Sequence, residues 1–128
     1  KGFYVYKGKR KQINKKMRDL IPVKRNNKSN GIGNVERMML IMINEAATCI
    51  EEGVVASPEL LDVAMIFGTG FPPFRGGVCR YADTIGIQRV VDNLSKLMEL
   101  HGNRFKPAES LKRLAADNKS FFSMKGEV

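Results

Sequence analysis

The chain has no tryptophan, one histidine and two cysteines among its 128 residues. Catalytic triads, dyads and most zinc sites need imidazole, so any such scheme here would have to use His101. Cys49 and Cys79 lie thirty positions apart, without a further cysteine or histidine at metal-ligand spacing. Neither a zinc site nor a disulfide framework is supported, and we expect two reduced, buried thiols.

Long apolar runs are also missing. The longest one covers residues 38–43, whereas a membrane-spanning helix needs about 20 apolar residues. The first residues do not read as a signal peptide, because a lysine-rich polar stretch follows Lys1-Gly2-Phe3-Tyr4. With no initiator methionine at its start, the chain is expected to be a soluble part of a longer polypeptide.

Acidic residues are scarce in the first quarter of the chain. Residues 1–33 contain eleven Lys and Arg and one acid, Asp19, a net charge of +10, while residues 34–128 contain eleven basic and twelve acidic residues, a net charge of −1. The overall charge of +9 is therefore local. We interpret residues 7–28 as a solvated basic linker with at most one weak helical turn near residues 15–20. Two alternatives stay open, namely contact with the phosphates of a ligand or with acidic protein surfaces, and binding of nucleic acid.

The rest of the chain shows helical periodicity. Apolar residues recur at three- and four-residue steps, which predicts helices over 35–52, from Ser57-Pro58 to Gly68, over 77–84, over 87–100 and for about ten residues after Pro107. Asn34 is the predicted N-cap of the first helix. The expected buried faces are Val35, Met38, Met39, Met42, Ile43, Ala46 and Ile50 on the first helix, and Leu60, Leu61, Ala64, Met65 and Phe67 on the second.

Glycine, proline and phenylalanine crowd into one segment, residues 67–77. Its sequence is Phe-Gly-Thr-Gly-Phe-Pro-Pro-Phe-Arg-Gly-Gly, and Cys-Arg-Tyr-Ala-Asp follows at 79–83. Glycines permit close backbone approach, prolines fix φ, and phenylalanines supply area for burial. The segment predicts a rigid packed corner between two helices. We call residues 67–77 the corner.

The corner and three other segments resemble the last domain of the multifunctional fatty-acid β-oxidation enzymes, which join an enoyl-CoA hydratase to a 3-hydroxyacyl-CoA dehydrogenase. The other segments are residues 1–6, which resemble the end of the preceding dehydrogenase domain, residues 35–59, which resemble the first helix pair, and residues 102–107. The resemblance implies an all-α fold of about five helices, of the 3-hydroxyacyl-CoA dehydrogenase C-terminal type, over residues 34–128. Residues 1–33 would be the end of the preceding domain and a basic, extended linker.

The resemblance also implies a role. The parent enzyme oxidises 3-hydroxyacyl-CoA with NAD and hydrates enoyl-CoA, in the cytoplasm or, in a eukaryote, in mitochondria or peroxisomes. This piece contains no counterpart of the family's catalytic His and Glu pair. Where the catalytic helical domain begins its first helix with Asn-Arg, this chain has Glu36-Arg37. We therefore expect no catalytic, cofactor-binding or metal-binding residue here, no turnover by the isolated chain, and a structural role for Glu36.

The expected partners are the upstream Rossmann and catalytic helical domains, with acyl-CoA bound by the parent. We expect self-association of the isolated chain.

Gly68-Thr69-Gly70 and Gly31-Ile32-Gly33 are too weak as motifs to predict NAD binding, because neither follows a strand and opens a helix. Arg75 and Arg80 have two interpretations. In the first, Arg75 fixes the backbone carbonyls of the corner, and Arg80 or Asp83 caps a neighbouring helix. In the second, this surface docks another domain and an arginine anchors it. The docking surface is assigned to Phe71, Pro72, Pro73, Phe74, Arg75, Gly76, Gly77, Arg80 and Tyr81. A polyanion-binding or nucleic-acid-binding module built on the basic segment is the alternative function.

Overall fold

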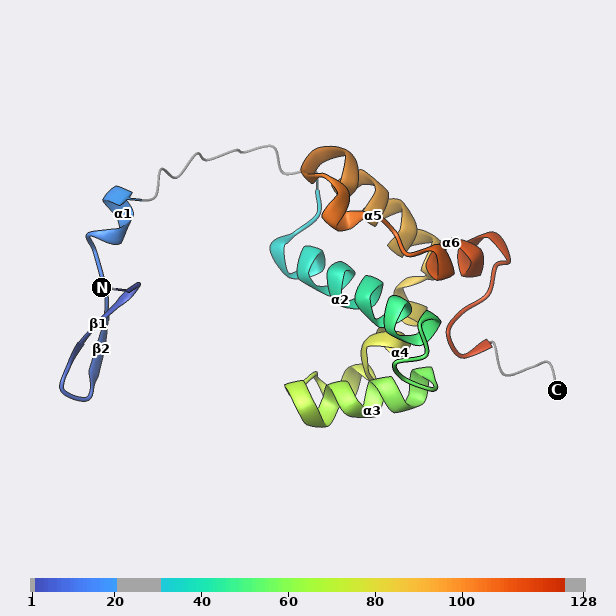
Figure 1. Cartoon of the computed structure of the whole chain (residues 1–128), viewed down its shortest axis with the longest axis horizontal. Helices are drawn as coiled ribbons and strands as arrows, with labels where there is room; N and C mark the ends of the chain where they lie inside the picture. The colour runs from blue at the N-terminus through green and yellow to red at the C-terminus, as the bar shows by residue number, and fades with distance from the viewer. Residues whose placement is uncertain (1, 21–30, 124–128) are drawn as a thin grey trace. The chain divides into compact units, whose positions relative to one another are not determined.

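The computed structural model describes residues 2–20 and 31–123 (Figure 1). Backbone contacts divide the chain into two compact units, Lys1–Gly31 and Ile32–Val128. We call residues 2–20 of the first unit the leading unit. We call residues 32–123, the described part of the second unit, the helical body. No helix in the described ranges is long and apolar enough to cross a membrane. The proposed domain boundary at residue 33 stays a prediction.

The leading unit is a β-hairpin followed by one helical turn. Strands β1 (Tyr4–Lys7) and β2 (Arg10–Ile13) pair antiparallel, with Tyr4 opposite Ile13, and α1 covers Met17–Leu20. Residues 10–13 were expected to be linker, so the second strand corrects that prediction. The sequence concealed it because Arg-Lys-Gln-Ile lacks apolar alternation; the two-residue turn at Gly8-Lys9 and the pairing with β1 decide its conformation instead.

The helical body contains five α-helices, as the periodicity predicted, and it confirms an all-α domain. Helix α2 packs on α4, α5 and α6, while α3 packs mainly on α4. Figure 1 shows α2 running between α5 and α3. The helices are α2 (Asn34–Glu51), α3 (Pro58–Thr69), α4 (Val78–Ile85), α5 (Ile87–His101) and α6 (Glu109–Ala116), with 3-10 turns η1 (Pro73–Arg75) and η2 (Asn103–Phe105).

Predicted helix ends differ from the observed ones by one or two residues. Asn34 is the first residue of α2, and Gly33 occupies the N-cap without a side-chain hydrogen bond. Helix α3 runs through Gly68 and stops at Gly70, whose φ of 73° reverses the chain at a position where most side chains would be strained. The start of α3 is confirmed, because Ser57 is the N-cap, its hydroxyl accepts from the Leu60 N–H, and Pro58 follows.

The buried faces differ from the predicted ones. On α2 the fully buried residues include Leu40 and Ile43, whereas Val35 and Met38 are 73% and 64% exposed. These two are three positions apart, so they share one side of α2, and that side faces solvent there. Helix α3 departs further from its prediction, since its buried residues are Leu61 and Asp62. The core is completed by Val78, Cys79, Ala82, Val90, Leu94, Leu97, Phe105, Leu111 and Phe121, among others.

Candidate functional site

The corner joins α3 to α4 and buries only one of its three phenylalanines. Phe71 is 4% exposed and belongs to the core, while Phe67 and Phe74 are 86% and 84% exposed. The Phe71 N–H donates to the Met65 carbonyl, which ties the start of the corner back to α3. The expectation that all three rings supply buried area is therefore wrong for two of them.

Asp62 fixes the other end of the corner. Its side chain comes from the middle of α3, is 3% exposed, and accepts from the Cys79 N–H at 2.7 Å and from the Arg80 N–H at 3.0 Å. These donors lie in the first turn of α4, where no intrahelical acceptor exists. A carboxylate at this end also complements the helix dipole. Asp62 therefore acts as a distant N-cap, and the sequence analysis missed it.

Gly77 makes this cap possible. Its φ is 110°, and a β-carbon built on it would collide with the Asp62 carboxyl carbon. The sequence held a signal for the arrangement, since Gly76-Gly77 offers no side chain to cap α4 while an acid interrupts the apolar face of α3. Burial and the nearby Asp62 charge raise the pKa of the Cys79 thiol far above its usual range, so Cys79 is an inert core residue, as expected.

The two arginines of the corner region contact aromatic rings. The Arg75 guanidinium lies 5.1 Å from the centre of the Tyr81 ring and 5.7 Å from that of Phe74, and the Arg80 guanidinium lies 3.6 Å from that of Phe122. Arginine stacks well on rings because its planar group is only weakly hydrated. These contacts replace the predicted pinning of corner carbonyls and helix capping by Arg80.

Asp83 fixes the C-terminal tail instead of capping a helix. Its carboxylate accepts from the backbone N–H groups of Phe121 at 2.9 Å and Phe122 at 3.1 Å. Phe121 is buried, and Phe122 lies beneath Arg80. This confirms the expectation that the two phenylalanines clip the tail onto the body.

The expected docking residues therefore separate into three groups by exposure. Phe71 and Gly77 are buried within the fold, so neither is available to a partner. Tyr81 is half-buried. Exposed residues are Pro72, Pro73, Phe74, Arg75, Gly76 and Arg80.

Glu36 is held by a neighbouring helix. Its Oε1 accepts from the Asn93 side-chain amide of α5 at 3.0 Å, and Glu36 lies in the first turn of α2, where a carboxylate complements the dipole. The adjacent Arg37 lies 5.7 Å from the centre of the Phe105 ring. Both members of the Glu-Arg pair thus tie α2 to the end of the body formed by α5 and η2.

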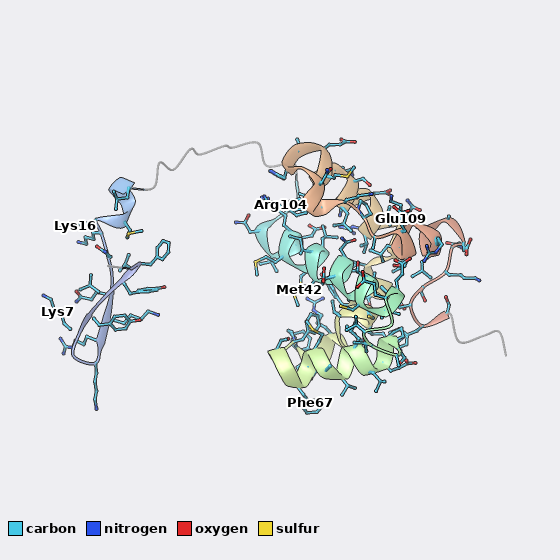
Figure 2. All side chains as sticks on the ribbon, viewed as in Figure 1. Lys7, Lys16, Met42, Phe67, Arg104 and Glu109 are labelled. Carbon is cyan, nitrogen blue, oxygen red and sulfur yellow. The ribbon has the colours of Figure 1, made fainter. Side chains whose placement is uncertain are left out.

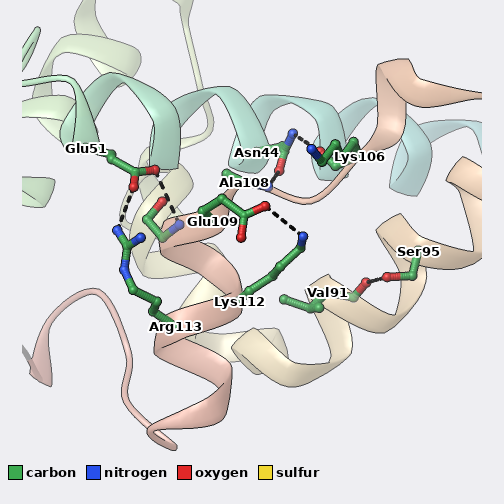
Figure 3. A network of polar contacts seen from close by, with 10 residues as sticks. Asn44, Glu51, Val91, Ser95, Lys106, Ala108, Glu109, Lys112 and Arg113 are labelled. Atoms are coloured by element: carbon green, nitrogen blue, oxygen red, sulfur yellow. Dashed lines mark hydrogen bonds and ion pairs between the residues drawn. The ribbon is translucent and has the colours of Figure 1, made fainter.

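Polar contacts between α2 and the segment around α6 are drawn in Figure 3. Asn44 donates to the Lys106 carbonyl at 3.0 Å and accepts from the Ala108 N–H at 2.8 Å, which holds the chain on both sides of Pro107. Glu51 accepts from Arg113 at 2.6 Å, and this hydrogen bond and ion pair lower the pKa of the Glu51 carboxyl. Asn44, Glu51 and Arg113 thus hold α2 to the segment around α6.

His101 and the two Gly-x-Gly segments are the remaining candidates for a reactive centre or a dinucleotide site. His101 ends α5 and stands 5.9 Å from the Phe105 ring, centre to centre. In the described part, no group of three or more His, Cys, Asp or Glu side chains is placed to hold a metal ion. Gly68 to Gly70 ends a helix, whereas a dinucleotide loop follows a strand. Gly31 to Gly33 precedes α2, and the residues before it lie outside the described ranges.

Comparison with known proteins identifies the fold family. Residues 34–122 match the sequence profile of the 3-hydroxyacyl-CoA dehydrogenase, C-terminal domain. The chain belongs to this family. The match covers all five helices of the body and the corner between α3 and α4. The suspected resemblance is thereby confirmed.

Curated relatives carry the same segment within longer proteins. The chain is 38% identical over 122 residues to the fatty acid oxidation complex subunit alpha of Vibrio vulnificus. It is 40% identical over 125 residues to that of Shewanella putrefaciens and 40% identical over 123 residues to that of Vibrio cholerae. Each alignment covers 95% of this chain but only 17–18% of the relative.

Proposed function

We propose that this chain is the structural C-terminal helical domain of a longer bifunctional β-oxidation protein, and that it packs against the catalytic dehydrogenase domain. The longer protein would combine an NAD-dependent 3-hydroxyacyl-CoA dehydrogenase with an enoyl-CoA hydratase in the cytoplasm. The domain would bind neither NAD nor acyl-CoA itself.

One observation carries the proposal: buried and half-buried polar side chains of the helical body hold its elements together, while large apolar side chains face solvent. Asp62, Asp83, Glu36 and Asn44 are hydrogen-bonded to neighbouring elements. Catalysis instead needs an acid, base or nucleophile free to reach a substrate. Exposed large apolar groups are characteristic of interfaces.

An activity assay tests the catalytic half of the proposal. We expect the purified chain to show no NADH oxidation with acetoacetyl-CoA, with the intact Shewanella putrefaciens relative as the positive control. Turnover by the chain at a rate near that of the intact protein would overturn the proposal. The His101→Ala variant would then show whether the only imidazole is responsible.

The exposed apolar groups also predict weak self-association of the free chain. Sedimentation equilibrium over a wide concentration range should show a reversible rise in mean mass, because no partner covers these groups. A strictly monomeric mass at the highest concentration would contradict this expectation.

The leading unit favours a second candidate, binding of polyanions. Six cationic side chains of the leading unit are exposed, and none of them pairs with a described carboxylate: Lys7, Lys9, Arg10, Lys11, Lys15 and Lys16. Binding of single-stranded DNA should weaken steeply with salt and disappear when residues 7–28 are deleted, because counterion release would drive it. Affinity that survives both changes would exclude the basic segment as its source.

A further inference from the structure

Helix α3 is apolar on two sides: Leu61, Met65 and Ile66 pack on the core, and a second apolar stripe faces solvent. Leu60 is 57% exposed, Val63 is 52% exposed and Phe67 is 86% exposed, and Ala64 between them is exposed as well. Figure 2 shows Phe67 on the side of α3 turned away from α2. We call Leu60, Val63, Ala64 and Phe67 the α3 face.

The spacing of the α3 face is that of a helix packed against another helix. Its residues stand at positions i, i+3, i+4 and i+7, the stripe through which amphipathic helices bury themselves. The charged residue Asp62 lies on the opposite, inner side of α3, where it is buried and caps α4. The body therefore covers one side of α3, which contains Asp62 and Leu61, and leaves the α3 face to solvent.

The α3 face carries no charge. The exposed residues from Leu60 to Gly70 include no Lys, Arg, Asp or Glu. An acidic or basic partner, including a nucleic acid, would gain no electrostatic contact there. At about 200 Å² per phenylalanine, Phe67 alone would present roughly 170 Å² of apolar surface. Such a surface fits the core of an interface, where charged residues are depleted.

We propose that the α3 face docks onto the apolar face of a helix in another domain of the same longer polypeptide. This rests on the proposed structural role, which it makes specific by assigning the contact to α3. The occupant follows from chain length, since more than four-fifths of each relative lies outside the segment that this chain matches. A helix is the element that complements an i, i+3, i+4, i+7 stripe.

A chimera provides the test, with this chain replacing the matched segment of the Shewanella putrefaciens protein. Photoreactive benzoylphenylalanine is introduced at Phe67, at Phe74 in the corner, or at Leu100 on α5 as the matched exposed control. We expect position 67 to cross-link to a helix of the dehydrogenase portion within one polypeptide, and position 100 to give at least tenfold less product.

The cross-linking outcomes separate the two proposals. Cross-links from position 74 but not 67 would overturn the α3 assignment and leave the docking function standing. The absence of cross-links to the dehydrogenase portion from both positions would overturn the docking function as well. Cross-links from position 67 to a second polypeptide, or to the leading unit, would show a different occupant and overturn the α3 assignment.

A measurement on the free chain checks the assignment without the chimera. Val63→Glu and Phe67→Glu should leave the urea midpoint of unfolding within error of wild type, as Leu100→Glu should, because these positions face solvent. A clear loss of stability confined to the two α3 variants would show that this chain itself covers the face, and would overturn the proposal.

Discussion

At the scale of single residues, the join between α3 and α4 depends on Asp62 and Gly77. Asp62 supplies the acceptor that the start of α4 lacks, and Gly77 leaves the room that this acceptor occupies. Sequence reasoning found the corner but not its key residue. Capping was expected from residues adjacent in sequence, whereas the carboxylate comes from 17 positions before the Cys79 N–H that it holds.

Removing the carboxylate should destabilise the chain. Asp62→Ala leaves two N–H groups of α4 without their acceptor and should cost roughly 2–4 kcal/mol of unfolding free energy. Asp62→Asn keeps one acceptor and should cost less. Asp92→Ala, on the outer side of α5, should stay within about 0.5 kcal/mol of wild type. Urea denaturation measures all three, and equal stability of Asp62→Ala and Asp92→Ala would refute the cap.

Two glycines of the corner should respond oppositely to alanine. At Gly77 the added methyl meets the Asp62 carboxyl, and the backbone has positive φ, so Gly77→Ala should cost several kcal/mol, about as much as a severe core defect. Gly68 lies inside α3 with no atom within 4 Å of an added methyl, so Gly68→Ala should gain up to about 1 kcal/mol. Thermal unfolding of the pair tests this; a Gly77→Ala protein as stable as wild type would rule out the close approach of Asp62 to Gly77.

At the scale of elements, the helices and their order could be predicted because periodicity and breakers mark them clearly. Ser57-Pro58 began α3 as expected. The faces were harder to predict, since apolar residues were assumed to point inward. Leu60 and Phe67 point outward because α3 packs on α4 with its Asp62 side. Strand β2 was missed because its residues carry no apolar pattern.

The contact between α2 and α6 predicts a pH effect. The hydrogen bond from Arg113 lowers the pKa of Glu51 below its usual 4.5, so the pair contributes stability above pH 4.5 that is lost as the pH falls through the lowered pKa. NMR titration should find the Glu51 pKa below 4.5 in wild type and higher in Arg113→Ala than in wild type. The control Lys112→Ala removes the partner of Glu109 instead and should leave Glu51 unchanged. An unaltered Glu51 pKa in Arg113→Ala would contradict the contact.

At the scale of the whole molecule, fold and family were accessible from the sequence, because the corner and the helix pattern are specific to that domain. Which side chains are exposed could not be predicted from the sequence, because exposure depends on which elements cover each face. Only the structure separates Phe71, which belongs to the core, from Phe67 and Phe74, which face solvent. Polar side chains of the helical body are hydrogen-bonded within it, while large apolar side chains face solvent. A domain of this kind is suited to pack against another domain.

Thermodynamic coupling within the chimera tests the central claim, that this domain docks onto the dehydrogenase portion. Calorimetry should show the dehydrogenase transition moving to lower temperature when Asp62→Ala destabilises this domain, because docked domains stabilise each other. The Asp92→Ala chimera should unfold like the parent chimera. A dehydrogenase transition that stays at the same temperature in the Asp62→Ala chimera, while this domain melts earlier, would contradict the account.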